Sequence, residues 1–106
     1  MESDKSSWVK TNHQSGKKRV LLNKEQSNTN LTQVALGFIE KNTTIENHKH
    51  PTMEEFFFIL SGNGLFILES KSLSVSQNDI IRVPANCDHS IEAISDLEFL
   101  YWGISI

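Results

Sequence analysis

The sequence predicts a small all-β domain that folds as an antiparallel sandwich or barrel. Short apolar segments recur at intervals of about ten residues, which is the spacing typical of such folds. Turn-forming residues separate these segments, and no segment combines helical periodicity with helix caps. A chain of 106 residues has the length of one domain and buries roughly two thirds of the surface that its unfolded form exposes. We therefore expect one domain with one hydrophobic core.

Apolar runs, alternating or continuous, place the strands along the chain. The expected strands cover residues 19–23, 31–40, 55–60, 65–69, 71–76, 79–83, 90–94 and 97–106. The sequence Ser-Gly-Asn-Gly at 61–64 predicts a tight hairpin turn that requires a positive φ, whereas residues 41–47 are expected to form a loop. Residues 1–17 are polar apart from one Trp-Val pair. We therefore expect an N-terminal arm at 1–17, followed by a single β-barrel domain at 18–106.

The strand expected at 55–60 is apolar on both faces. Alternation along the strand divides its side chains into two sets, with Phe57 and Ile59 on one face and Phe56, Phe58 and Leu60 on the other. The second set, together with the apolar C-terminal strand, offers more apolar surface than one small barrel can cover. The sequence therefore predicts a homodimer.

Composition and charge argue against several classes of function. The formal net charge is −3 and the pI is near 5.7, whereas a protein that binds nucleic acid needs a clustered positive field. The basic cluster of Lys17, Lys18 and Arg19 is interpreted as a solvated strand edge. No segment approaches the roughly 18 apolar residues of a membrane span, and the N-terminal residues lack the apolar stretch of a signal peptide. We therefore expect a cytoplasmic protein without a nucleic-acid or membrane partner.

Two histidines that lie one residue apart suggest half of a metal site. The side chains of His48 and His50 project from the same face of an extended backbone, so both imidazoles can converge on one ion. Glu55 follows five residues after His50, and in a regular strand this odd spacing would place its side chain on the opposite face. Pro51 breaks the strand, so the Glu55 side chain can turn back toward the histidines before the next strand begins. His89 follows a loop much later in the chain and is a fourth candidate ligand.

The spacing of these residues resembles the two motifs of the cupin superfamily. The first motif, which places glycines before and after H-x-H and a glutamate, falls on Asn42, His48, His50, Glu55 and Gly62. The second motif falls on Asn78, Pro84, Asn86, His89 and Ala93. The resemblance covers residues 31–106 and implies a small antiparallel β-barrel, or jelly roll. It also implies that one divalent ion binds inside the barrel to His48, His50, Glu55 and His89.

The chain departs from the family pattern at four positions. Asn42, Asn78 and Asn86 replace glycines, and asparagine is the residue that, after glycine, best tolerates a left-handed backbone conformation. We therefore expect the three turns to be kept. Ala93 replaces an asparagine, which removes a side chain that could form a hydrogen bond next to the site.

The candidate ligands restrict the choice of metal and leave the function open. Three neutral imidazoles and a carboxylate suit Mn, Fe, Co, Ni or Zn, whereas Ca and Mg prefer sites made of oxygen atoms. We expect a metal-dependent enzyme in which the ion acts as a Lewis acid, such as an isomerase of a small sugar- or oxo-acid-like substrate. An Fe-dependent dioxygenase and a non-catalytic metabolite-binding protein remain as alternatives. Some cupin-like domains have also lost their metal.

Other residues near the motifs have more than one possible role. Glu54 could be the metal ligand or a catalytic base, although only Glu55 leaves the six residues before Gly62 that the family spacing requires. Cys87, the single cysteine, cannot form an internal disulfide and is interpreted as a small structural residue rather than part of a pocket mouth. His13 lies in the polar arm, matches neither motif and is expected to be exposed to solvent. The sequence identifies neither the substrate nor the catalytic residues.

Overall fold

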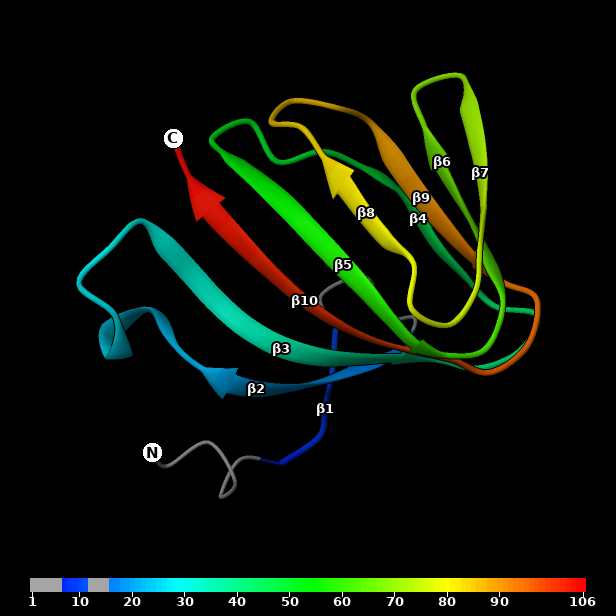
Figure 1. Ribbon diagram of the computed structural model, residues 1–106, viewed down its shortest axis with the longest axis horizontal. Coiled ribbons are helices and arrows are strands. Elements are labelled where there is room, and N and C mark those ends of the chain that lie inside the picture. Colours follow the sequence, from blue (N-terminus) through cyan, green and yellow to red (C-terminus); the bar gives the residue numbers. More distant parts are fainter. Residues whose placement is uncertain (1–6, 12–15) are drawn as a thin grey trace.

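The computed structural model, which describes residues 7–11 and 16–106, consists of two antiparallel β-sheets that face each other (Figure 1). Its strands are β1 (Val9–Lys10), β2 (Lys17–Leu22), β3 (Leu31–Ile39), β4 (Thr44–His48), β5 (Met53–Ser61), β6 (Gly64–Leu68), β7 (Lys71–Val75), β8 (Ile80–Val83), β9 (His89–Ala93) and β10 (Leu97–Ser105). One sheet has the order β1-β2-β3-β10-β5-β8 and the other has the order β4-β9-β6-β7. This arrangement confirms the predicted all-β jelly roll, although the two sheets do not share strands that would close a barrel.

The prediction of a loop at 41–47 is wrong, because most of this segment belongs to β4. The strand β4 covers Thr44–His48 and pairs with β9. Only Ile45 of this strand is buried, and the polar residues on either side of it hide the alternation that identifies a strand. Another short element, the 3-10 turn Lys24–Gln26, lies in the connection between β2 and β3. The described residues include no helix that is long and apolar enough to cross a membrane.

Part of the predicted N-terminal arm joins the larger sheet. β1 pairs with the start of β2, with Val9 opposite Lys18 and Lys10 opposite Lys17. Trp8 is partly exposed, with 39% of its surface accessible. His13 lies outside the described residues, so its exposure stays a prediction.

Aromatic packing joins the two sheets across the hydrophobic core. Phe57 of β5 packs against Phe66 of β6, with the ring centroids 5.0 Å apart. Phe99 and Tyr101 of β10 lie beside Phe57, each with its centroid 5.5 Å away. Buried aromatic rings each cover a large apolar area, and edge-on pairs of this kind stabilise a core beyond that burial. The cluster therefore helps to set the separation of the sheets and the positions of the side chains between them.

The three asparagines that replace family glycines adopt the left-handed conformation expected of them. The φ angles are 67° at Asn42, 73° at Asn78 and 62° at Asn86. Gly62 has a φ of 92°, as the predicted hairpin turn requires. The turn at Asn86 also connects two loops, because its backbone N–H donates a hydrogen bond of 2.8 Å to the carbonyl oxygen of His50.

Apolar side chains gather on the outer face of the larger sheet. Phe58 lies opposite Leu100, and Phe56 lies opposite Trp102 with the two rings stacked 5.6 Å apart. The four side chains are half-buried, whereas Phe57 and Ile59 face the core, as the alternation predicts. The outer face is therefore a continuous apolar surface over β5 and β10.

We predict that glycine is accepted at position 86 and alanine is not. The Asn86→Ala variant should lose about 1 kcal/mol of unfolding free energy, because alanine tolerates a positive φ poorly, whereas Asn86→Gly should stay close to the original protein. Urea unfolding of the three proteins measures the difference. Equal stability of the alanine and glycine variants would contradict the left-handed conformation.

We propose that the apolar outer face is covered by a second copy of the chain in a homodimer. Light scattering should give twice the 12.0 kDa of one chain at micromolar concentration. Phe58→Glu should shift the mass to that of a monomer, because a carboxylate in this interface would be desolvated without a partner. Leu73→Glu, at an exposed position on the other sheet, is the control that should remain dimeric. A monomeric original protein would refute the proposal.

Candidate metal centre

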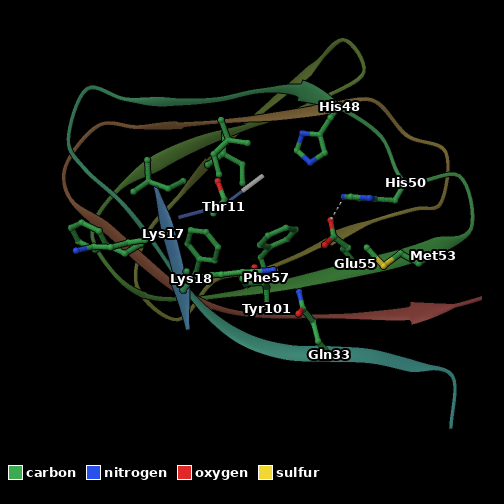
Figure 2. A pocket seen from close by; sticks show the side chains of 16 residues that line it. Thr11, Lys17, Lys18, Gln33, His48, His50, Met53, Glu55, Phe57 and Tyr101 are labelled. Atoms are coloured by element: carbon green, nitrogen blue, oxygen red, sulfur yellow. Dashed lines mark ion pairs between the residues drawn. The ribbon is translucent and has the colours of Figure 1, made fainter. Parts of the chain in front are cut away.

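Four side chains that are far apart in the sequence converge between the sheets. His48, His50, Glu55 and His89 each offer one ligand atom, and these atoms lie within 4.8 Å of one another. Figure 2 shows His48, His50 and Glu55 pointing toward one another. The structure therefore brings together all four residues that the sequence suggested as metal ligands.

A β-bulge turns His48 toward the interior. Ile45 pairs with Ile91 and His48 pairs with His89, but the register shifts between these two pairs. In a regular strand, side chains three positions apart face opposite sides. The shift allows both Ile45 and His48 to face inward, and residues 46–47 between them are exposed. The bulge places the His48 ring next to the His89 ring, with their centroids 4.2 Å apart.

The turn at residues 51–52 brings Glu55 to the same place. β5 begins directly after this turn, and Glu55 faces the interior with only 6% of its surface exposed. Its Oε1 atom lies 3.3 Å from Nε2 of His50, the ion pair drawn in Figure 2. The change of facing that the sequence predicted at Pro51 is thus present.

Backbone carbonyls orient two of the imidazoles. Nδ1 of His48 lies 2.8 Å from the carbonyl oxygen of Glu46, and Nδ1 of His89 lies 2.9 Å from that of Cys87. A carbonyl oxygen can only accept, so in each ring Nδ1 carries a proton and Nε2 is the nitrogen left for the cluster. This is the arrangement by which a protein prepares a histidine for metal binding.

The buried Nε2 atom of His89 lacks a hydrogen-bond partner within the described part of the chain. It lies 3.5 Å from Oε1 of Glu55, in a contact that does not satisfy it. Leaving a buried polar atom unsatisfied costs about 1–3 kcal/mol, so such an atom calls for a partner. A cation beside three imidazole nitrogens and a carboxylate would supply that partner, and the cluster is therefore able to hold a metal ion.

Opposing effects set the pKa of Glu55. Burial alone would raise this pKa, but the interactions with His50 and His89 outweigh burial and lower it to about 2. The hydrogen bond with Glu55 raises the pKa of His50, against the lowering effect of burial. The Glu55 carboxylate is therefore ionised at neutral pH, as a metal ligand must be.

Neither Glu54 nor Cys87 belongs to the cluster. Glu54 faces the outer side of the sheet, where its Oε2 atom accepts a hydrogen bond of 2.8 Å from Nε of Arg82. Its suggested roles as a ligand or as a catalytic base are therefore wrong. Cys87 packs against the hydrophobic core, which agrees with its interpretation as a structural residue.

A cavity of about 150 Å³ extends from the cluster between the sheets (Figure 2). Besides His48, His50 and Glu55, the polar residues that line it are Thr11, Lys17, Lys18, Gln33 and Tyr101. The sequence did not identify these five as lining residues, because their facing depends on how distant strands pair. Burial raises the pKa of Tyr101 to about 12, so its hydroxyl remains a neutral hydrogen-bond donor.

Comparisons with known proteins agree with this fold. The family model of the cupin domain matches residues 36–103, which include the whole cluster. A predicted oxalate decarboxylase from Thermotoga maritima has a TM-score of 0.84 at 26% identity, over 95% of this chain and 92% of that one. KdgF from Halomonas sp. has a TM-score of 0.81 at 12% identity, over 97% of this chain and 89% of that one, which shows a shared fold alone.

A further relative matches a shorter segment of the chain. An uncharacterized protein of Methanocaldococcus jannaschii is 40% identical over 50 residues, or 47% of this chain. The match spans 40% of that protein's own length. This similarity therefore concerns one part of a longer protein.

We predict that the protein carries close to one transition-metal ion per chain and that Glu55→Gln or His50→Ala removes most of it. Each substitution deletes one ligand, and Glu55→Gln also removes the negative charge that attracts a cation. Elemental analysis of proteins prepared without chelator measures the metal content.

The matched control is Glu54→Gln, which makes the same chemical change one residue away on the outer face. It breaks an exposed ion pair worth at most about 1 kcal/mol and should leave the metal content unchanged. Equal metal in the Glu54 and Glu55 variants, or none in the original protein after it is offered metal, would contradict the assignment.

Proposed function

We propose that this chain, which belongs to the cupin domain family, is a metal-dependent enzyme that uses one divalent ion as a Lewis acid. The ion would be Mn, Fe, Co, Ni or Zn, held by His48, His50, Glu55 and His89. The observation that carries the proposal is the buried Nε2 atom of His89, which lacks a hydrogen bond among the described residues yet faces an ionised carboxylate. Two imidazoles oriented through Nδ1 support the same assignment.

The cavity beside the cluster gives a substrate access to the ion. A bound ion of this kind polarises a carbonyl or hydroxyl oxygen and stabilises the negative charge that develops on it. Around that position the chain offers neutral donors, the Tyr101 hydroxyl and the Gln33 amide, to orient the substrate. Phe57 and Phe99 limit the water around it. This environment suits isomerisation or a related proton transfer on a small sugar- or oxo-acid-like substrate.

The cavity lining favours Lewis-acid chemistry over oxygen activation. The thioether of Met53 and the ring of Tyr101 line the same cavity as the candidate ligands. A reactive oxygen species formed there would meet an oxidisable sulfur at close range. We therefore prefer the Lewis-acid enzyme to the Fe-dependent dioxygenase.

A substrate screen tests this function. Protein loaded separately with Zn and with Fe is incubated without oxygen with sugar phosphates, oxo acids and oxalate, the last because one structural relative is described as a predicted oxalate decarboxylase. We expect NMR to detect a product with Zn as well as with Fe, because a Lewis acid needs no redox change. The Glu55→Gln variant should form none.

Two results of this screen would contradict the proposal. If no product forms without oxygen, and a parallel incubation in air shows substrate loss that occurs only with Fe and consumes oxygen at an electrode, the dioxygenase would be indicated. Saturable binding of a compound without product, with either metal, would indicate the non-catalytic metabolite-binding protein.

A further inference from the structure

We propose that Lys18 makes this cavity specific for a small carboxylic acid. The carboxylate of this acid pairs with the Lys18 ammonium, and another of its oxygen atoms reaches the metal ion. The proposal rests on the proposed function, because it requires that the four ligand residues hold an ion. It goes beyond that function by choosing the acid over the neutral sugar as the class of substrate.

The pairing of β2 with β3 turns Lys18 inward. Lys18 lies opposite Gly37, whose neighbours on the same face of β3, Ala35 and Ile39, are buried in the core. Figure 2 shows the Lys18 side chain extending from β2 into the cavity, toward Phe57 and Tyr101. Lys18 therefore lines the cavity, and its sequence interpretation as part of a solvated strand edge does not describe it.

The neighbouring lysine shows the opposite arrangement. Lys17 lies opposite Phe38, and its ammonium sits 5.3 Å from the centroid of that ring. Its side chain points away from the histidines in Figure 2. Lys17 also lines the cavity, but its ammonium lies against the Phe38 ring, so the two lysines differ in where they place their charge.

Lys18 is a half-buried residue. Among the residues that the structure describes, no carboxylate lies within 4.0 Å of its ammonium, the limit for an ion pair. The carboxylate that lines the cavity, Glu55, is paired with His50 and His89. The positive charges of a divalent ion and of Lys18 add up to more than the single negative charge of Glu55. Because unpaired charge is costly in a partly apolar cavity, the site favours an anionic ligand.

The size and lining of the cavity narrow the anion to a carboxylate. A volume of about 150 Å³ equals that of about five water molecules, which suits an acid of about two to five carbon atoms. Phosphate has more oxygen atoms to satisfy and is bound in proteins by arrays of backbone N–H groups or by several cations. Of the two lysines in the lining, Lys17 places its ammonium against the Phe38 ring. The Lys18 ammonium and the neutral Gln33 and Tyr101 groups remain to match the two oxygens of one carboxylate.

Pairs of acids and amides of the same shape test the inference. Calorimetry of the Mn-loaded protein compares pyruvate, lactate and malonate with pyruvamide, lactamide and malonamide, and inorganic phosphate serves as a further probe. The acids should bind at least about tenfold more tightly than their amides, which is the expected contribution of a charged hydrogen bond. Lys18→Met should abolish this preference, and Lys18→Arg should restore much of it.

Lys71→Met is the matched control, because it removes the same charge from an exposed position on β7 that does not line the cavity, and it should keep the preference. Thermal unfolding and elemental analysis establish that each variant is folded and loaded with metal. A protein that binds no metal would overturn the proposed function and this inference together. In loaded protein, four results would overturn the inference alone: no binding of any acid, acids and amides bound equally by the original protein, an acid preference that survives Lys18→Met, or phosphate bound more tightly than the acids.

Discussion

The negative charge of Glu55 is held between two β-sheets, with 6% of the residue exposed, and the surrounding residues are arranged to accommodate it. Removing a carboxylate from water costs several kcal/mol unless positive charge and hydrogen bonds replace the water. His50 and His89 lie 3.3 and 3.5 Å away and lower the pKa of the carboxyl group. These two imidazoles do not fully replace the lost water, because Nε2 of His89 still lacks a hydrogen bond among the described residues. A divalent ion bound to all four residues would satisfy both needs.

Irregular backbone at three places creates this arrangement within a regular scaffold. The bulge in β4 turns His48 inward, and the turn at residues 51–52 separates His50 from Glu55 so that their side chains meet. The left-handed turn at Asn86 supports His50 by a hydrogen bond to its carbonyl oxygen. Pairing is regular at Phe57 itself, although the register of β5 with β10 shifts between Glu98 and Phe99. Bulges and left-handed turns occur elsewhere in the chain too, and these three are the ones that position the candidate ligands.

The sequence predicted the features that depend on residue type and short spacing. These include the all-β class, the convergence of His48 and His50 and the left-handed asparagines, each of which has a local physical reason. The addition of His89 to the ligand set came from the resemblance to the cupin motifs. Prediction from the sequence failed where long-range pairing decides the outcome. The strand β4 shows little local alternation, and its bulge has no signature in residue type. The inward facing of Lys18 depends on its pairing with Gly37. Register between strands is set by such tertiary contacts, so a local reading of a basic cluster could not place this lysine in the cavity.

X-ray absorption spectroscopy of the metal-loaded protein shows whether three imidazoles and the Glu55 carboxylate hold one ion. We expect scattering from three imidazole rings at metal–nitrogen distances of about 2.0–2.2 Å, together with a carboxylate oxygen, when Zn is bound. Glu55→Gln should change the oxygen contribution and leave the imidazole signal in whatever metal remains bound. A spectrum with one imidazole or none, or with a sulfur ligand from Cys87 at about 2.3 Å, would contradict the account.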